Sequence, residues 1–189
     1  MGIAVFASGN GSNFQSLIDC SNKENWEVPI SLLICDRPNA KAIERAQAAK
    51  VPYRCINPHD FADKVRYEQE IVNTLEEYQI KWIVLAGYMR IIGETILNPF
   101  IGKIVNIHPS LLPAFPGKHA IEEAFTYPVK ITGVTIHFID EGIDTGPIIA
   151  QEAVSVDPDD TLASLEDKIH RVEHRLYPKI VRSWVEGKL

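Results

Sequence analysis

The first half of the chain alternates between short apolar runs and segments with helical periodicity. Four runs are typical of buried strands, and they cover Ile3 to Ala7, Ile30 to Cys35, Val51 to Ile56 and Ile80 to Gly87. Strands that alternate with helices form a parallel sheet with right-handed crossovers. The sequence therefore predicts an α/β fold with a Rossmann-like, three-layer, doubly wound and mostly parallel sheet.

Two helices are predicted between the last three of these strands. The first covers Asn39 to Ala49 and is capped by Asn39. The second covers Asp60 to Tyr78, and we expect its apolar side chains to form an inner face. Those side chains are Phe61, Val65, Ile71, Val72, Leu75 and Tyr78. Lys64 and Tyr67 fall beside this stripe, where solvent exposure is the default expectation.

The second half predicts two strands and a long helix. Ile131 to Ile139 alternates, with Thr135 and His137 on the polar face, and Pro147 to Val154 follows as an antiparallel partner. We expect His137 to be a hydrogen-bonded structural residue. Asp159 or Asp160 is expected to cap the closing helix, and Pro178 to bend or end it. Its predicted stripe is Leu162, Leu165, Ile169, Val172, Leu176, Ile180 and Trp184, with His170, Glu173 and Tyr177 on the flank.

Size and composition narrow the classes of protein. A chain of 189 residues is expected to form one domain, 1–189, and its net charge of −6 argues against a general nucleic-acid surface. Its 3 cysteines are odd in number and none lies in a CxxC, which is typical of a reducing compartment. There is no signal-peptide pattern and no apolar run of membrane-spanning length. We expect a cytoplasmic protein that binds neither nucleic acid nor membrane.

A glycine-rich turn, SGNGSN, follows the first apolar run and precedes a helical pattern. Such a turn offers backbone N–H groups to an anion. A P-loop would end in Gly-Lys-Ser/Thr, and the lysine is missing. A dinucleotide fingerprint would need a third glycine where Phe14 stands, although Asp36 lies where a ribose-binding acid belongs. A phosphate monoester held by Gly11, Ser12 and Asn13 fits best, and a capped turn without ligand is the alternative.

The stretch from Lys103 to Gly117 reads KIVNIHPSLLPAFPG and combines a short β-branched run with a proline-rich loop. Asn106 and His108 are two residues apart, so on a strand they point to the same side, about 7 Å apart. An amide can donate to an oxygen that becomes negative, and an imidazole can donate or carry a proton. This pair is suited to chemistry on a carbonyl; a buried strand with a satisfied polar end is the alternative.

Other catalytic patterns are missing from the sequence. No HxH, HExxH or Cys/His cluster indicates a metal, and no GxSxG elbow indicates a nucleophile. Asp144, in a Gly-bounded loop 36 residues after His108, is the best candidate for tuning the histidine. A carboxylate close to an imidazole favours the imidazolium and raises its pKa.

Taken together, several stretches resemble the phosphoribosylglycinamide formyltransferases, the 10-formyltetrahydrofolate-dependent family of purine synthesis. The stretches are SGNGSN, AGYMRI (Ala86 to Ile91), NIHPSLLPAFPG, GVTIHFIDEGIDTGPII (Gly133 to Ile149) and the closing helix. The resemblance runs essentially end to end, and NIHPSLLP with DTGPI is highly specific to folate-dependent formyl-transfer domains. It implies a formyltransferase fold with a phosphate-binding half, 1–100, and a catalytic and folate-binding half, 101–189.

The resemblance also implies two small-molecule sites. Glycinamide ribonucleotide would be bound by Gly11, Ser12, Asn13, His170 and Glu173. The co-substrate 10-formyltetrahydrofolate would be bound by Lys64, Met89, Arg90, Ile91, Ile92, Asn106, Asp140, Glu141, Gly142, Ile143 and Asp144. Two departures from the family pattern stand out: Lys118 replaces a commonly apolar residue, and His170 lies at a variable position.

For catalysis, the resemblance implies direct formyl transfer without a metal. His108 would be the proton donor, Asn106 would stabilise the oxyanion with it, and Asp144 would raise the pKa of His108. The family further implies a monomer or weak homodimer whose partners are its two small-molecule substrates.

Four alternatives remain from the sequence. A formyltetrahydrofolate deformylase carries an extra N-terminal domain, for which we expect no room before Ile3. A methionyl-tRNA formyltransferase carries a further C-terminal RNA-binding domain, and no basic extension is expected after Leu189. An NAD-binding oxidoreductase would use Gly9, Gly11 and Asp36. A non-catalytic module that binds a phosphorylated ligand is the fourth, and Asn106, His108 and Asp144 argue against it.

Overall fold

The computed structural model describes residues 1–189, and its strands form one seven-stranded sheet in the order β3-β2-β1-β4-β5-β6-β7. The strands are β1 (Gly2–Ala7), β2 (Ile30–Cys35), β3 (Tyr53–Cys55), β4 (Ile80–Leu85), β5 (Ile104–His108), β6 (Ile131–Phe138) and β7 (Ile148–Ser155). The helices are α1 (Ser12–Glu24), α2 (Lys41–Ala48), α3 (Lys64–Glu77), α4 (Glu94–Leu97), α5 (Ala120–Thr126) and α6 (Leu162–Val185), with short 3₁₀ turns at Pro58–Asp60 and Asn98–Phe100.

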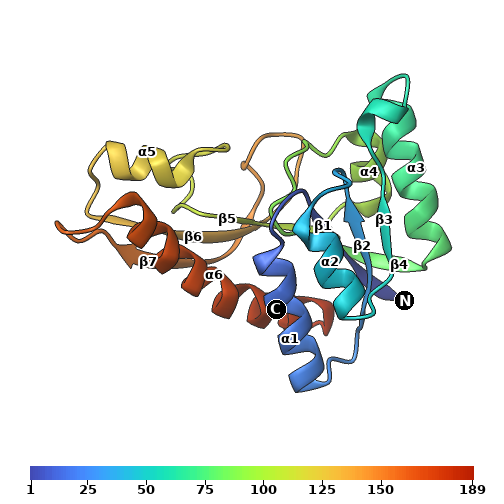
Figure 1. Cartoon of the computed structure of the whole chain (residues 1–189), viewed down its shortest axis with the longest axis horizontal. Coiled ribbons are helices and arrows are strands. Elements are labelled where there is room, and N and C mark those ends of the chain that lie inside the picture. The colour runs from blue at the N-terminus through green and yellow to red at the C-terminus, as the bar shows by residue number, and fades with distance from the viewer.

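The sheet confirms the predicted fold class. Strands β1 to β5 pair in parallel, whereas β6 is antiparallel to β5 and β7 is antiparallel to β6. Figure 1 shows α6 running along β6 and β7 until it reaches α1. No helix combines the length and the apolar character needed to cross a bilayer.

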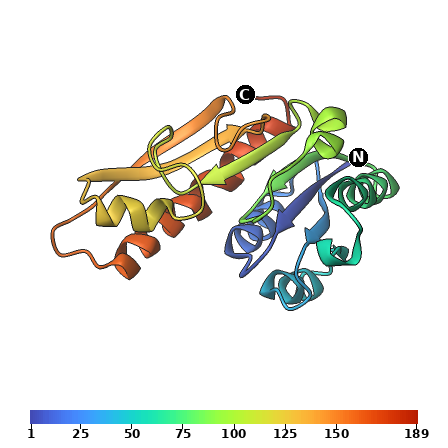
Figure 2. The same cartoon turned by 90° about the horizontal axis from the view of Figure 1, so that it is seen from above.

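The core consists of two layers because successive strand side chains point to opposite faces of the sheet. On one face Val5, Val84 and Val105 pack with α1, α2 and α6. On the other face Phe6 and Leu85 pack with α3 and α4. The two helical layers can be followed in Figure 2. The second layer takes only Ile104 from β5 and no residue from β6.

The predicted start of α3 was wrong. The helix begins at Lys64 because the Asp63 side chain accepts a hydrogen bond from the Arg66 N–H and caps it. Its inner face contains Ile71, Val72 and Leu75 as predicted, but Val65 is 64% exposed and Tyr67 is buried at 4%. The start of α2 differs similarly, since it begins at Lys41 and has no side-chain cap.

The predicted cap of α6 was wrong, and its predicted inner face was incomplete: Leu165 and Ile169 are buried as expected, and Val172, Leu176, Ile180 and Trp184 are partly buried against the core. Thr161 caps the helix, in a capping box with Ser164, and the helix continues through Pro178 to Val185. The fully or nearly buried side chains of α6 are Leu165, Ile169, Glu173, Tyr177, Pro178, Val181 and Val185. Two of the residues expected on the flank, Glu173 and Tyr177, therefore belong to the buried face, whereas His170 is exposed.

Tyr177 fastens α6 to the middle of the sheet. Its fully buried hydroxyl donates to the carbonyl of Leu85 at 2.8 Å and lies 3.3 Å from the carbonyl of Val105. These carbonyls lie on β4 and β5. The contact therefore fixes the helix that carries Glu173 against the strands that carry the central polar residues.

Candidate active site

One cavity of about 500 Å³ opens at the carboxyl ends of β1, β4 and β5. This edge of an open α/β sheet is where ligands commonly bind. The lining contains every residue of the predicted phosphate, folate and catalytic sets except Lys64 and Glu141. Residues from both halves of the chain, from Ser8 to Glu173, therefore surround a single space.

Strand β5, which lies between β4 and β6, presents two polar side chains to this cavity. Val105 and Ile107 point into the core, and Asn106 and His108 point to the opposite side, as the alternation predicts. Across the antiparallel pairing with β6, Asn106 lies opposite His137 and His108 lies opposite Thr135. Asn106 and His108 thus line the cavity, while their cross-strand partners His137 and Thr135 are fully buried beside them.

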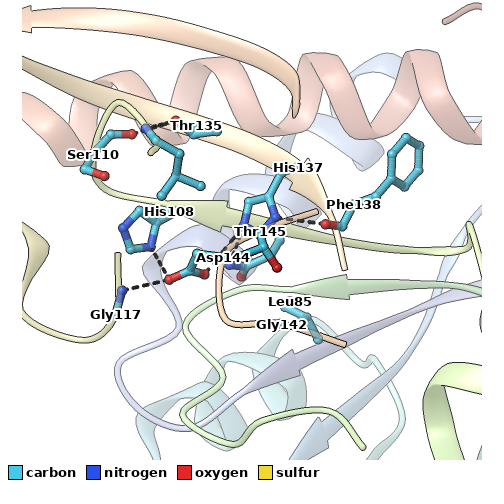
Figure 3. A network of polar contacts seen from close by, with 12 residues as sticks. Leu85, His108, Ser110, Gly117, Thr135, His137, Phe138, Gly142, Asp144 and Thr145 are labelled. Carbon is cyan, nitrogen blue, oxygen red and sulfur yellow. Dashed lines mark hydrogen bonds and ion pairs between the residues drawn. The ribbon is translucent and has the colours of Figure 1, made fainter. Parts of the chain in front are cut away.

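The His108 ring lies between two oxygen acceptors, of which Figure 3 shows the Asp144 carboxylate. Its Nδ1 lies 3.4 Å from Oδ2 of Asp144, and its Nε2 lies 2.8 Å from the carbonyl oxygen of Phe115. A carbonyl only accepts, so Nε2 carries a proton. A second proton on Nδ1 would face the carboxylate, so a doubly protonated ring would find an acceptor at each nitrogen.

Asp144 is placed by an ordered loop between β6 and β7. Its Oδ2 accepts the Gly117 N–H at 2.8 Å, and its backbone has a left-handed φ of 55°. Asp140 stabilises the loop by accepting hydrogen bonds from the Gly142 N–H at 3.0 Å and the Thr145 hydroxyl at 2.7 Å. A non-glycine residue is unusual at this φ. The strained backbone aims the carboxylate at His108.

His137, expected to be structural, takes part in the central polar network. Burial lowers the pKa of His137, which favours its neutral form. Its Nδ1 donates to the Phe138 carbonyl at 2.9 Å, so Nε2 holds the lone pair and accepts from the Asn106 amide at 3.2 Å. His137 thereby fixes the side-chain amide of Asn106 with its N–H end toward the ring. The second N–H of that amide remains available to a ligand.

A buried hydroxyl network, which the sequence reasoning missed, supports the proline-rich loop. Thr135 donates to the Ser110 carbonyl at 2.7 Å and accepts from the Leu112 N–H at 3.1 Å. Ser110 in turn donates to the Ala114 carbonyl. The alternation of β6, which puts Thr135 on the same face as His137, was the available signal. The network holds the turn that brings the Phe115 carbonyl to His108.

The glycine-rich turn forms an open helix N-terminus at the cavity. Gly11 has φ 73°, and no side chain caps the first turn of α1, so the N–H groups of that turn are free for an anion. A Cβ on Gly11 would lie 2.8 Å from the Cβ of Ala42. Arg45 secures the turn by donating to the Asn10 carbonyl at 2.8 Å and to the Asn10 side-chain oxygen at 2.9 Å.

Glu173 is a buried carboxyl beside this turn. It is 5% exposed and accepts a hydrogen bond from the Asn13 amide at 3.0 Å. Burial raises the pKa of Glu173, while the Asn13 hydrogen bond and His170 act in the opposite direction. His170 also lines the cavity, and its ring stacks on His174 with centroids 6.2 Å apart. Burial in turn lowers the pKa of His174.

The cavity rim after β4 combines apolar and cationic side chains. Met89 and Ile91 are 44% and 58% exposed, and the Met89 N–H donates to the Ser8 hydroxyl at 2.8 Å. Lys64 lies outside the lining, with Nζ 3.5 Å from Glu68. Glu141 also lies outside it.

Other polar groups in the lining bear on its chemistry. Arg37, which the sequence reasoning missed, and Lys118 line the cavity. No group of three or more His, Cys, Asp or Glu side chains is arranged to hold a metal ion.

Comparison with known proteins identifies the family. A family profile described as "Formyl transferase" matches residues 1–181. The phosphoribosylglycinamide formyltransferase of Bacillus subtilis is 50% identical over 179 residues, which cover 95% of this chain and 92% of that protein. The human trifunctional purine biosynthetic protein adenosine-3 is 38% identical over 185 residues, or 98% of this chain and 18% of that protein.

Solved structures agree with the sequence comparisons. The phosphoribosylglycinamide formyltransferase of Bacillus halodurans superposes with a TM-score of 0.95 at 51% identity, covering 98% of this chain and 95% of that one. The glycinamide ribonucleotide transformylase 1 of Geobacillus kaustophilus gives a TM-score of 0.94 at 52% identity, covering 96% and 97%. By its sequence and its fold, this chain is an enzyme that belongs to the formyl transferase family.

Proposed function

We propose that this enzyme transfers the formyl group of 10-formyltetrahydrofolate to the primary amine of N1-(5-phospho-D-ribosyl)glycinamide. The products would be the N-formyl ribonucleotide and tetrahydrofolate, in purine synthesis. The names of the similar proteins support the ribonucleotide as acceptor. A folate donor fits a formyl transferase whose cavity has an apolar rim at Met89 and Ile91.

One observation supports the proposal most strongly. Asn106, His108 and Asp144 converge in the cavity that also contains the open N-terminus of α1. A helix N-terminus suits a phosphate, and the amide with the imidazole suits an oxyanion. The phosphate of one substrate and the reacting carbonyl of the other can therefore be held in one space.

The proposed reaction begins with attack of the glycinamide amine on the formyl carbon. The formyl oxygen becomes an oxyanion, stabilised by the free N–H of Asn106 and by a proton of His108. The nitrogen that attacked loses a proton, the bond from the formyl carbon to folate N10 breaks, and N10 gains a proton. The carbonyl re-forms on the acceptor, so no covalent enzyme intermediate is needed.

In this proposal Asp144 faces Nδ1 of His108 and holds the ring in the correct orientation. The Gly117 N–H and the loop around Asp140 keep the carboxylate in place. The Phe115 carbonyl accepts the Nε2 proton in the present conformation. Delivery of that proton to the substrate requires an exchange of partner, from the Phe115 carbonyl to the formyl oxygen.

Each substrate has a proposed set of contacts in the cavity. The phosphate binds Gly11, Ser12 and Asn13, and the remainder of the ribonucleotide lies along His170 and Glu173. The folate lies along the loop after β4 and the loop that carries Asp144. Its proposed contacts are Met89, Arg90, Ile91, Ile92, Asn106, Asp140, Gly142, Ile143 and Asp144, while Lys64 and Glu141, outside the lining, would require a ligand that extends beyond the cavity.

Folate release tests the proposal. Purified enzyme is mixed with 10-formyltetrahydrofolate alone, with added glycinamide ribonucleotide, or with the N-acetylated ribonucleotide, whose amine is blocked. Release of tetrahydrofolate only with the free amine supports formyl transfer. Equal release under all three conditions would mean hydrolysis, as in a deformylase, and would overturn the proposal.

A further inference from the structure

Asp36 is a fully buried carboxylate that the proposed reaction does not use. It follows β2, and its side chain is 0% exposed. Its Oδ2 accepts a hydrogen bond from Nε of Arg90 at 2.8 Å, and its Oδ1 has no hydrogen-bond partner. A buried charge is costly unless it is paired. Arg90 supplies that pairing, so the position of one side chain depends on the other.

Arg90 uses only part of its guanidinium in this contact. The hydrogen bond from Nε is its one side-chain hydrogen bond within the chain, and neither terminal nitrogen donates to the protein. The side chain is 40% exposed and lines the cavity. Fixed through Nε, the two terminal nitrogens form a planar pair of donors that suits a carboxylate.

The rim segment Arg90 to Gly93 is fixed at its other end by a second buried carboxylate. Glu68 is 3% exposed and accepts the Gly93 N–H at 2.7 Å. A Cβ on Gly93 would lie 2.7 Å from both Glu68 carboxylate oxygens, so the segment approaches Glu68 as closely as a glycine allows. The segment is thus preorganised before any ligand binds, which lowers the entropy cost of binding.

We propose that Asp36 is a positioning residue, which aims the terminal nitrogens of Arg90 at the carboxylate of the glutamate portion of the folate. This inference rests on the proposed folate donor. Asp36 thereby sets the preference of the site for donors that carry this carboxylate over donors that lack it. It also assigns a role to the acid that, in a dinucleotide fold, would bind ribose.

The substrate phosphate is the competing ligand for Arg90. The phosphate already has an uncapped helix N-terminus at Gly11 to Asn13. Arg90 instead lies on the loop after β4, next in the sequence to the exposed apolar residues Met89 and Ile91, and all three line the cavity. A cation on the same loop as exposed apolar side chains suits a ligand that joins an aromatic body to a carboxylate, as folate does.

Binding measurements separate this role from a purely structural one. Dissociation constants are measured by calorimetry for tetrahydrofolate and for tetrahydropteroate, which lacks the glutamate, and for glycinamide ribonucleotide. Asp36→Asn should raise the dissociation constant of tetrahydrofolate about 10-fold, which is the scale of a charge-assisted hydrogen bond. The constants for tetrahydropteroate and for the ribonucleotide should not change. Glu77→Gln, which removes the exposed partner of Arg54 away from the cavity, is the matched control and should change nothing.

Further variants keep the test decisive. In an Arg90→Met background, adding Asp36→Asn should not reduce the preference for tetrahydrofolate any further. If Asp36→Asn fails to fold, Asp36→Glu keeps the charge but displaces the guanidinium by one methylene group, and it should reduce the same preference.

Three results would overturn the inference. An unchanged ratio of the two folate constants would leave Asp36 with a structural role only. Weaker ribonucleotide binding would assign Arg90 to the phosphate. If the wild-type enzyme binds neither folate compound, the proposed donor itself is refuted. If the wild type binds both and Asp36→Asn binds them equally well, only the role of Asp36 is refuted.

Discussion

His108 and Asp144 meet in the cavity although 36 residues separate them, with Nδ1 of the ring 3.4 Å from Oδ2 of the carboxylate. The contact depends on two separate loops. The Gly117 N–H holds the carboxylate, and the Phe115 carbonyl holds the opposite ring nitrogen. The catalytic rate should therefore depend on the Asp144 carboxylate.

Replacing Asp144 by asparagine tests the coupling. The Asp144→Asn side chain retains the size of the carboxylate but loses its charge, so the His108 ring no longer faces an anion at Nδ1. We expect kcat to fall about 10²- to 10⁴-fold, the range for loss of general acid catalysis, with little change in the Kd for the ribonucleotide. The pH dependence of kcat should also change. A variant with the wild-type pH profile would contradict the coupling.

Gly11 tests the anion site at the start of α1. A residue with a side chain must hold its backbone at φ 73° here, and its Cβ would contact Ala42. The strained backbone and the close contact together cost about 1 to 3 kcal/mol. Gly11→Ala should therefore displace the free N–H groups and raise the Kd for glycinamide ribonucleotide. Calorimetry with both substrates checks this result. An equal loss of folate affinity would place the phosphate elsewhere.

Glu173 should make stability depend on pH. Burial raises the pKa of Glu173 above its value in the unfolded chain, so the folded state binds more protons, and stability falls as pH rises through this interval. Glu173→Gln removes the ionisation and can keep the Asn13 contact. At pH 8 the variant should unfold at a higher urea concentration than the wild type, and below pH 4 the two should differ little. The expected difference in unfolding free energy at pH 8 is about 1.4 kcal/mol per unit of pKa shift.

The same substitution should weaken ribonucleotide binding, because Glu173 is proposed to contact the part of the ribonucleotide beyond the phosphate, and a carboxylate accepts hydrogen bonds from its N–H and O–H groups more strongly than an amide does. Urea titrations at several pH values, paired with calorimetry, check both effects. A stability difference that does not vary with pH would contradict the assigned ionisation.

Tyr177 links helix packing to the sheet. Tyr177→Phe leaves the Leu85 and Val105 carbonyls without the hydroxyl in a fully buried environment. Loss of this buried hydrogen bond should cost about 1 to 3 kcal/mol of unfolding free energy. Urea unfolding measures the loss, and the exposed Tyr127→Phe variant is the matched control. Equal stability of the two variants would refute the role of the buried hydroxyl.

Much of the fold could be predicted because strand and helix periodicity are local properties of the sequence. The error on α6 has a physical cause. Its buried face includes Glu173 and Tyr177, whose polar atoms find partners only across the fold, in Asn13 and in two strand carbonyls. A stripe chosen by apolar character alone passes over such residues. The position of the cap at Thr161 likewise depends on a reciprocal contact with Ser164.

The residues around the proposed reaction centre could be named in advance because Asn106 and His108 share one face of a strand. The roles of His137 and Asp36 could not be predicted in the same way. His137 orients Asn106 only because the register of β6 places it opposite. Asp36 meets Arg90 only because β2 and the loop after β4 end at the same edge of the sheet. Both relationships are tertiary, and no local pattern contains them.

Single-turnover transfer by a His108→Ala variant tests the central claim most directly. The formyl-transfer rate is measured with the enzyme saturated by both substrates, and Kd values are measured separately by calorimetry. We expect the rate to fall at least about 10²-fold, while each Kd changes less than about threefold. A rate close to that of the wild type, or a loss explained entirely by weaker binding, would contradict the role of His108 at the formyl oxygen.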